Sequence, residues 1–480
     1  MEDNPLRTLK TYGQSVWLDL LRRSLITGGM LERLVDEDGL SGITSNPKIF
    51  DKAIEGSDDY DADLRALHAA GHDTARIQRE LMITDIQLAA DVLRPVYERT
   101  GGGDGFVSLE VSPHLARDTA GTVREAGELW EAVDRPNLLI KIPATVEGLP
   151  AIRRCLAAGI NINVTLLFGL SRYRQVAEAY LQGLEDRLGA GQPVDRIASV
   201  ASFFLSRIDV LVDRLLEEIE QQDGPRGRRR QVAQQLRGRV AIASARAAHA
   251  IYREIVGGDR FRALERRGAR PQRLLWASTS TKNPEYSDVK YVEALIGPDT
   301  VNTMPLETLD AYRDHGRPAP RLEGEEAGPH ATLATLTEIG IDIDRVTEQL
   351  EEEGIEKFVT PHDRLLEAIG DKRRRLGGTQ QLDRQLLELG EAGREVRARL
   401  EQLGRERFGE RLWRREPDLW TSAPAAQETV LSGLGWLHVA DTMAERLGEL
   451  HAFSEQVRRD GFERIVHMGM GGSSLTPLVL

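Results

Sequence analysis

The chain has 480 residues, and its 40% hydrophobic and 29% charged residues are typical of a globular protein and exclude a disordered one. Its 63 Lys and Arg residues against 76 Asp and Glu residues give a net charge of −13, which excludes a general electrostatic attraction to nucleic acid or to an anionic membrane. The single cysteine, Cys155, excludes an intramolecular disulfide framework and a cysteine-rich metal site, and it indicates a reducing, cytoplasmic compartment.

Short apolar runs alternate with helix-patterned stretches over the first two-thirds of the chain. The runs predict strands at Val16–Leu20, Gly42–Ser45, Phe106–Val111, Leu138–Ile142, Ile160–Leu166, Ile197–Phe203, Leu274–Ser278 and Thr300–Met304. Because several runs are rich in Val, Ile and Leu without strict alternation, we expect strands buried on both faces, as in a parallel sheet. Eight strands separated by helices, such as those predicted at Ser171–Leu188 and Leu205–Gln222, indicate an α/β fold whose sheet closes into a (βα)8 barrel.

The barrel pattern ends near Pro318. Helices are then predicted at Ala331–Gly340, Ile343–Gly354, Asp363–Ile369, Leu382–Leu403 and Glu428–Val457. The charged, glycine-bounded segment 371–378 predicts a linker between a domain over residues 1–370 and a second one over residues 379–480. No run of about 18 apolar residues predicts a transmembrane helix, and the N-terminus lacks the basic-then-apolar pattern of a signal peptide.

In a (βα)8 barrel the active site lies at the C-terminal ends of the strands. The polar residues in or just after the predicted strands are therefore the candidates for chemistry. They are Asp19, Thr44, Ser45, Asn46, Ser108, Glu110, Lys141, Asn161, Asn163, Thr165, Ser199, Ser202, Ser206, Arg207, Ser278 and Lys282. No set of His, Cys and carboxylate residues has the spacing of a metal site.

Lys141 is the most informative of these residues. It lies in the middle of an apolar strand, where an ammonium group costs several kcal/mol unless it is paired or deprotonated. Burial lowers the pKa of a lysine, and a neutral lysine amine in a barrel can attack a carbonyl and form a Schiff base. The alternative is a structural ion pair with a residue of a neighbouring strand, for example Glu110.

The two carboxylates Asp19 and Glu110 lie on different strands, so that one could handle substrate protons and the other a water molecule. Each also has a structural interpretation: Asp19 as the N-cap of the following helix, and Glu110 as a partner in a salt bridge. Asn46, which precedes a proline, could serve turn geometry, and Asn163 could satisfy buried backbone groups. Cys155 lies in a helical pattern and is most simply a packing residue.

Several motifs resemble those of one enzyme family. Ser41–Pro47 resembles the N-terminal signature of the transaldolases, and Asn137–Thr145 followed by Gly159–Phe168 resembles their lysine-strand signature. Trp276–Pro284 and Thr300–Pro305 are similar to the late-barrel motifs of the family. The resemblance covers about residues 5–370. It implies a barrel of the class I aldolase type that moves a dihydroxyacetone unit between sugar phosphates in the pentose phosphate pathway, with no metal and no organic cofactor.

The resemblance also implies roles for individual residues. Lys141 would form the Schiff base, Asp19 would accept the proton of the substrate C4 hydroxyl, and Glu110, supported by Thr165, would activate the catalytic water. The residues that would bind the substrate are Asn46, Asn163 and Ser202 for the three-carbon hydroxyls, and Arg207 with Ser278 for the terminal phosphate.

At two positions the residue type can be compared with that of related enzymes. Phe204 stands where the related fructose-6-phosphate aldolases carry a tyrosine, which favours transfer over release of free dihydroxyacetone. Ser280 stands where many transaldolases have an arginine, and Lys282 could replace it as the second phosphate cation; the sequence leaves open which of the two completes the site.

The end of the chain has a resemblance of its own. The turn Gly471-Gly472-Ser473-Ser474, which follows a predicted strand, resembles the sugar-phosphate turn of glucose-6-phosphate isomerases, and such a turn can bind phosphate at a helix N-terminus. The combination resembles bifunctional transaldolase/glucose-6-phosphate isomerases. Residues 379–480 would then be a partial, α/β isomerase-like segment of a truncated chain, and we expect no isomerase activity from it.

The sequence therefore predicts a transaldolase that acts on small sugar phosphates through a lysine Schiff base, without nucleic-acid or membrane partners. Another Schiff-base enzyme on the same barrel, a fructose-6-phosphate aldolase, is one alternative. A non-catalytic sugar-phosphate-binding module is the second. The sequence does not determine the oligomeric state, and a homodimer is among the assemblies that it allows.

Overall fold

Eight parallel strands close into a barrel in the first of two compact units, Met1–Leu382 and Asp383–Leu480. The structure is a computed structural model that describes residues 4–45, 50, 54, 57–224, 227–323, 327–376 and 393–462. Asn46 and the predicted phosphate turn Gly471–Ser474 lie outside these described residues.

The strands follow one another around the barrel in chain order, each paired with the next, and the last pairs with the first. They are β1 (Gln14–Leu18), β2 (Gly42–Ile43), β3 (Phe106–Glu110), β4 (Leu138–Pro143), β5 (Ile162–Leu167), β6 (Ser199–Phe204), β7 (Arg273–Ala277) and β8 (Thr300–Met304). The predicted (βα)8 barrel and its eight strands are thus confirmed, with ends that shift by one to two residues. For example, β7 stops at Ala277 because Ser278 has a φ of 54°, which extended backbone does not allow.

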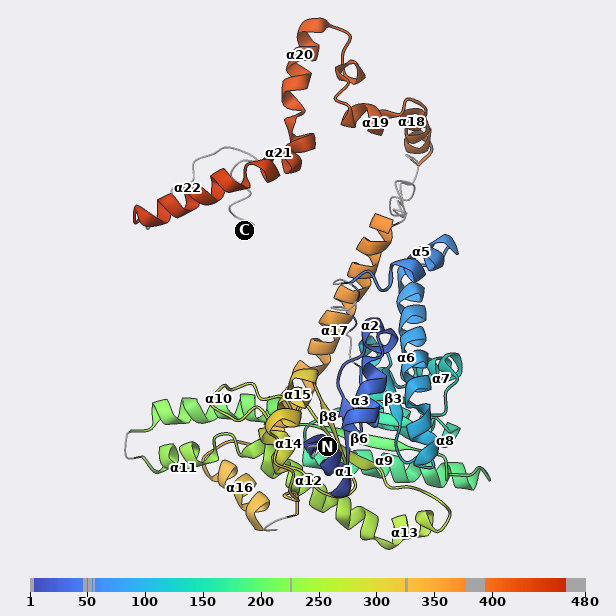
Figure 1. Cartoon of the computed structure of the whole chain (residues 1–480), viewed down its shortest axis with the longest axis vertical. Coiled ribbons are helices and arrows are strands. Elements are labelled where there is room, and N and C mark those ends of the chain that lie inside the picture. Colours follow the sequence, from blue (N-terminus) through green and yellow to red (C-terminus); the bar gives the residue numbers. More distant parts are fainter. Residues whose placement is uncertain are drawn as a thin grey trace. The chain divides into compact units, whose positions relative to one another are not determined.

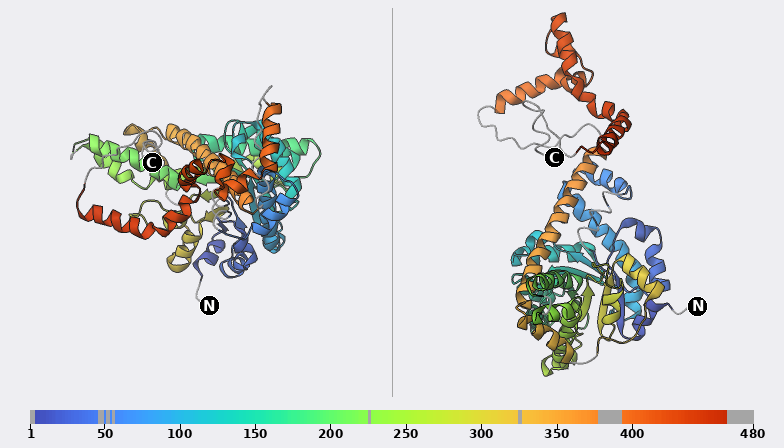
Figure 2. Two further views of the ribbon diagram at one scale, coloured as in Figure 1. Left: turned by 90° about the horizontal axis from the view of Figure 1, so that it is seen from above. Right: turned by 90° about the vertical axis from the view of Figure 1, so that its left-hand side faces the viewer.

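Helices surround the strands, as Figures 1 and 2 show. Those of the first unit are α1 (Pro5–Thr11), α2 (Arg23–Thr27), α3 (Met30–Asp38), α5 (Asp61–Ala69), α6 (Thr74–Arg99), η1 (Pro113–Leu115), α7 (Thr119–Val133), α8 (Gly148–Ala158), α9 (Leu170–Gly189), α10 (Ser206–Gln222), α11 (Arg228–Leu236), α12 (Val240–Gly257), α13 (Asp259–Glu265), α14 (Lys290–Ala294), α15 (Leu306–His315), α16 (Ala327–Glu338) and α17 (Ile343–Leu376). Asp73 and Asp118 cap the N-termini of α6 and α7 by accepting hydrogen bonds from backbone N–H groups of the first turn. Cys155 is fully buried in α8, and burial raises the pKa of its thiol to about 12, so it is a packing residue.

The helix α17 differs from the sequence prediction. The sequence indicated two shorter helices and a linker that starts at residue 371, whereas one helix runs from Ile343 to Leu376 and has Pro361 inside it. Its last turns contact the start of α5 and the residues before it. Lys372 pairs with Asp61 at 2.7 Å and donates hydrogen bonds to the carbonyls of Ile54 and Ser57. These contacts keep residues 371–376 helical.

The described residues of the second unit form helices only. They are α18 (Gly393–Arg405), α19 (Phe408–Trp413), η3 (Pro417–Leu419), α20 (Pro424–Gly433), η4 (Gly435–His438), α21 (Val439–Glu445) and α22 (Leu447–Arg459). Among them the buried side chains are those of Leu434 and Leu437, and large apolar side chains such as Phe453 are exposed. The strand predicted before Gly471 lies outside the described residues. None of the described helices of the chain combines the length and the apolarity that crossing a membrane requires.

A close approach in the barrel wall gives a first prediction. Gly42 in β2 faces the buried ring of Trp17, and a methyl group at residue 42 would lie well inside the van der Waals distance of that ring. We expect Gly42→Ala to lower the free energy of unfolding in urea by about 1–3 kcal/mol through overpacking. The matched control is Gly127→Ala in α7, where a methyl group meets no atom within 4 Å. It should raise the same quantity by up to about 1 kcal/mol through helix propensity. Equal effects of the two substitutions would contradict this account.

Candidate active site

A cavity of about 240 Å³ opens at the C-terminal ends of the strands, and we call it the mouth cavity. Its lining residues come from segments far apart in the sequence. Residues that follow β1 and β2 lie beside residues of β4, β6 and β8 and of the helix α17. The lining residues are Asp19, Thr44, Lys141, Ser202, Phe204, Arg207, Ala277, Ser278, Ser280, Lys282, Thr303, Pro305, Glu307, Lys357 and Phe358. Seven of the residues to which the sequence analysis gave a role line this one cavity, namely Asp19, Lys141, Ser202, Phe204, Arg207, Ser278 and Lys282.

Lys141 is paired inside the barrel with Glu110. The two residues are register neighbours on β4 and β3, and Lys141 Nζ lies 2.6 Å from Glu110 Oε1. Nζ also donates a hydrogen bond to the backbone oxygen of Ser45 at 2.9 Å, and only 5% of Lys141 and 9% of Glu110 is exposed. The ion pair that the sequence allowed as an alternative is thus present, and its lysine lines the mouth cavity.

The electrostatics of Glu110 follow from its burial. Burial raises the pKa of the Glu110 carboxyl to about 7, although the ammonium of Lys141 acts in the opposite direction. The carboxylate of Asp19 adds to the increase. Near neutral pH this carboxyl group can therefore both accept and release a proton, which is what a general acid-base group requires.

Asp19 is not the N-cap of the helix that follows it, α2. It lies three residues before Arg22, which is the N-cap of α2, and its backbone N–H donates to the carbonyl of Met304. Its carboxylate accepts a hydrogen bond from Thr44 Oγ1 at 2.9 Å, and Thr44 in turn lies 2.8 Å from Thr303 Oγ1. The helix-cap interpretation is thus wrong, and the carboxylate is held at the mouth cavity by hydroxyl groups.

Thr165 borders a second, small cavity of about 20 Å³. This cavity also touches Glu110, Lys141 and Phe358, and its volume is about that needed for one water molecule. Within the described part of the chain, the buried hydroxyl of Thr165 has no hydrogen-bond partner. The arrangement offers a carboxyl group, a hydroxyl group and an amine to one small polar molecule.

Asn163 belongs to a side-chain network inside the barrel. It is the register neighbour of Lys141 on β5, its Nδ2 donates to Ser108 Oγ at 3.0 Å, and its Oδ1 accepts from Ser202 Oγ at 2.6 Å. All three side chains of this network are buried. The network fixes the orientation of the Asn163 amide next to Lys141.

The cation Arg207 lies in the first turn of α10, directly after β6. Its guanidinium lies 5.6 Å from the centre of the Phe204 ring, and within the described residues its buried Nη1 atom has no hydrogen-bond partner. Burial lowers the pKa of Arg207, whereas the carboxylates of Glu353 and Asp19 act to raise it. An anion in the mouth cavity could satisfy this guanidinium.

Ser278 and Lys282 lie next to Arg207 in the lining. Ser278 is held by Ser206, because their hydroxyl oxygens are 2.8 Å apart and Ser206 N donates to Ser278 O. Lys282 Nζ donates to Ser280 Oγ at 2.6 Å, so both residues that the sequence considered as the second phosphate ligand line the cavity together.

Lys357 and Phe358 are among the lining residues that the sequence analysis missed. Both lie on α17 and line the mouth cavity, and Lys141 Nζ is 5.8 Å from the centre of the Phe358 ring. The only local signal is the spacing of Glu353 and Lys357, which form an i,i+4 ion pair at 2.8 Å. In a sequence, such a pair is typical of a solvated helix face.

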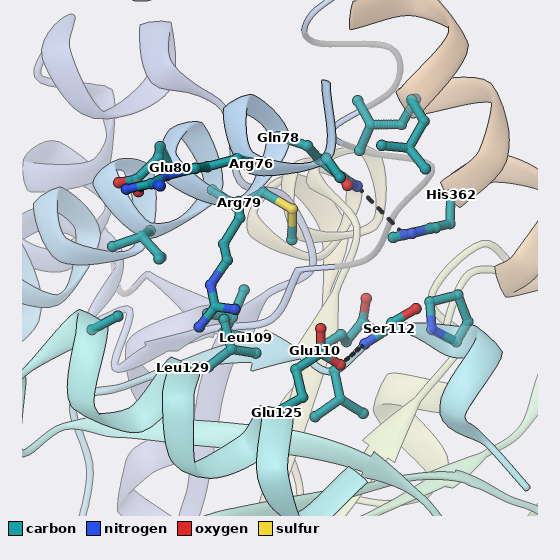
Figure 3. Close-up of a pocket in the computed structure, with 18 of the residues that line it drawn as sticks. Arg76, Gln78, Arg79, Glu80, Leu109, Glu110, Ser112, Glu125, Leu129 and His362 are labelled. Carbon is teal, nitrogen blue, oxygen red and sulfur yellow. Dashed lines mark hydrogen bonds and ion pairs between the residues drawn. The ribbon is translucent and has the colours of Figure 1, made fainter. Parts of the chain in front are cut away.

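A larger pocket of about 740 Å³ lies between α6, α7 and α17 (Figure 3). The Arg79 side chain extends into it toward Leu109 and Leu129, and Ser112 N donates to Glu125 at 2.7 Å on its wall. Its lining contains cations and anions together, namely Arg76, Arg79, Asp73, Glu80, Glu110 and Glu125. Glu110 is the one predicted site residue among them, so this pocket reaches the barrel from the side, and its mixed charge identifies no ligand class.

Comparisons with known proteins find a matching family and several similar proteins. Residues 16–369 match the family described as Transaldolase/Fructose-6-phosphate aldolase. The chain is 48% identical over 368 residues to a transaldolase of Saccharopolyspora erythraea, which covers 76% of this chain and 97% of the relative. It is 46% identical over 378 residues to a transaldolase of Trichodesmium erythraeum, with 78% of this chain and 99% of the relative covered. A transaldolase of Thiobacillus denitrificans is 46% identical over 367 residues, which span 76% of this chain and 100% of the relative.

The electrostatics of Glu110 give a second prediction. We expect the carboxylic acid band of Glu110, identified in infrared spectra by its loss in Glu110→Gln, to titrate with a midpoint near pH 7. Lys141→Met should move the midpoint to higher pH, because the ammonium that stabilises the carboxylate is removed. A midpoint near 4.5, the ordinary value for glutamate, would show that burial does not raise the pKa of the Glu110 carboxyl.

Proposed function

The chain belongs to the transaldolase/fructose-6-phosphate aldolase family, and from that premise we propose which residues carry out the transfer of a dihydroxyacetone unit between sugar phosphates. As a transaldolase, it transfers this unit from sedoheptulose 7-phosphate to glyceraldehyde 3-phosphate, which gives erythrose 4-phosphate and fructose 6-phosphate. The observation that carries the assignment of residues is the buried Lys141–Glu110 pair, whose lysine lines the mouth cavity.

The reaction begins with attack of the neutral Lys141 amine on the C2 carbonyl of the ketose. The amine must first lose a proton, and Glu110, 2.6 Å away and with a pKa of about 7, accepts it. Loss of the C2 oxygen as water then leaves an iminium ion on Lys141. Glu110 returns a proton to the departing oxygen, and Thr165 holds the water in the small cavity that both residues line.

Asp19 carries out the next step. Its carboxylate, oriented by Thr44, accepts the proton of the C4 hydroxyl group. The C3–C4 bond then breaks, its electron pair moves into the iminium, and the aldehyde product leaves an enamine on Lys141. Attack of this enamine on the carbonyl carbon of the acceptor aldehyde reverses the sequence and completes the transfer.

The intermediate has to be protected from water while the first aldehyde leaves and the second one arrives. Phe358 and Phe204 line the cavity beside Lys141 and restrict its volume. Asn163 and Ser202, together with Asn46, bind the hydroxyl groups of the three-carbon unit. Asn46 lies outside the described residues, so its role rests on the family motif alone.

The terminal phosphate of the substrates needs cationic and hydroxyl partners in the cavity. We assign it to Arg207, whose Nη1 has no hydrogen-bond partner within the described residues, and to Ser278, which lines the same cavity. Lys282, held by Ser280, adds positive charge there. Guanidinium groups bind phosphate oxygens strongly because the hydrogen bonds are charge-assisted.

For residues 379–480 we propose a likeness to the beginning of a glucose-6-phosphate isomerase domain. Its support is the sequence of Gly471-Gly472-Ser473-Ser474, which lies outside the described residues. We propose no isomerase activity for this segment. A cytoplasmic location is proposed from the single cysteine, Cys155, which is free and buried.

Trapping with borohydride tests the central residue. We expect the peptide that contains Lys141 to gain a reduced three-carbon adduct when the enzyme is treated with fructose 6-phosphate and borohydride. In Lys141→Met the adduct should be absent, and transfer should fall by about a thousandfold or more, because the nucleophile is lost. Lys10→Met, at an exposed lysine of α1, is the control and should retain both adduct and activity. An adduct at another lysine, or none, would contradict the assignment.

The same preparation separates transfer from the aldolase alternative. Incubation with fructose 6-phosphate but no acceptor should release dihydroxyacetone far more slowly than transfer proceeds. Release at the rate of transfer would identify a fructose-6-phosphate aldolase instead.

A truncated chain tests where the activity is located. All described residues that line the mouth cavity lie between Asp19 and Phe358, within the first compact unit. We therefore expect a chain that ends at Leu382 to keep kcat/KM for transfer within about twofold of the full chain, since no catalytic group is removed. A tenfold loss in a truncated chain with an unchanged circular dichroism spectrum would show that the second unit contributes to catalysis.

A further inference from the structure

The mouth cavity collects cations from elements far apart in the chain. Besides Lys141, its lining includes Arg207 from α10, Lys282 from the loop after β7 and Lys357 from α17. Its lining carboxylates are Asp19 and Glu307. In a chain with a net charge of −13, this local excess of positive charge favours an anionic ligand.

The partners of these cations differ. Lys141 is neutralised by Glu110, and Lys282 donates to the hydroxyl of Ser280. Lys357 is paired with Glu353 at 2.8 Å, and 54% of its side chain is exposed. An ion pair at this level of exposure is worth little, because water and salt screen it, and it exchanges easily for a stronger partner.

One cation does not balance the charge of a sugar phosphate. A phosphate monoester carries a charge of about −1.5 to −2 near neutral pH, whereas Arg207 supplies a single positive charge. Lys357 lines the same cavity, and the carboxylate that now holds it, Glu353, also acts electrostatically on Arg207. Glu353 therefore lies where its negative charge is felt by two cations at the mouth of the barrel.

We propose that Lys357 binds the phosphate group of the sugar-phosphate substrates together with Arg207, and that the phosphate replaces Glu353 as its partner. This inference rests on the proposed function, because it names a further residue for substrate recognition in the same site. It gives α17 a part in specificity, since the helix carries the phosphate ligand Lys357 beside Phe358, which lies near the amine of Lys141.

The test compares a phosphorylated with an unphosphorylated acceptor. Because transfer has two half-reactions with a covalent intermediate, kcat/KM for the acceptor reports the second half-reaction alone. It is measured for glyceraldehyde 3-phosphate and for glyceraldehyde, with sedoheptulose 7-phosphate as donor. The variants are Lys357→Met and, as a matched control on the same helix, Arg345→Met, whose side chain is 86% exposed and does not line the cavity.

We expect Lys357→Met to lower kcat/KM for glyceraldehyde 3-phosphate by about tenfold or more, mainly through a higher KM, as the loss of a charged hydrogen bond requires. The value for glyceraldehyde should stay within about twofold, and Arg345→Met should change neither value. An equal loss for both acceptors, or no loss for either, would overturn the role of Lys357. An unmodified chain that transfers nothing to glyceraldehyde 3-phosphate would instead overturn the proposed function.

Discussion

The ion pair between Lys141 and Glu110 is the interaction on which the rest of the site depends. A buried ammonium without a partner is strongly destabilising, and the parallel register of β3 and β4 places a carboxylate directly beside it. The same burial raises the pKa of Glu110 to about 7, so that Glu110 can accept and release a proton near neutral pH. The structural interpretation of Lys141 and the catalytic one are therefore compatible: the pairing that makes the lysine tolerable in the core also prepares it for attack on a carbonyl group.

The strand register and the closure of the barrel also position the other polar residues of the site. Register continues from Lys141 to Asn163 on β5, and the network from Asn163 to Ser202 crosses to β6. Closure of β8 onto β1 brings Thr303 to Thr44, which orients Asp19 on the far side of the cavity. Lys141, Asp19 and Asn163 are thus each held by a hydrogen-bonding neighbour, which is how an interior of low polarity retains polar side chains in one geometry.

The sequence predicted the parts of the site that lie on strands. Eight apolar runs, seven of them with candidate polar residues in or just after them, were sufficient for the barrel and for Lys141, because strand order in a parallel barrel follows chain order. It could not predict Lys357, since helical spacing does not tell which distant surface a helix will cover. It also predicted two helices, Ile343–Gly354 and Asp363–Ile369, where α17 is one helix that contains Pro361 and whose last turns contact Asp61 through Lys372. Tertiary contacts therefore outweigh the local sequence preference that predicted a break in this helix.

The central claim is that Lys141 forms a covalent bond to C2 of the ketose with loss of its oxygen as water. The most direct measurement is the incorporation of oxygen-18 from labelled water into C2 of fructose 6-phosphate, followed by mass spectrometry with no acceptor present. Formation and hydrolysis of the Schiff base exchange this oxygen, so the account predicts incorporation well above the rate without enzyme, and only that background rate for Lys141→Met. Incorporation by the unmodified enzyme at the background rate would contradict it.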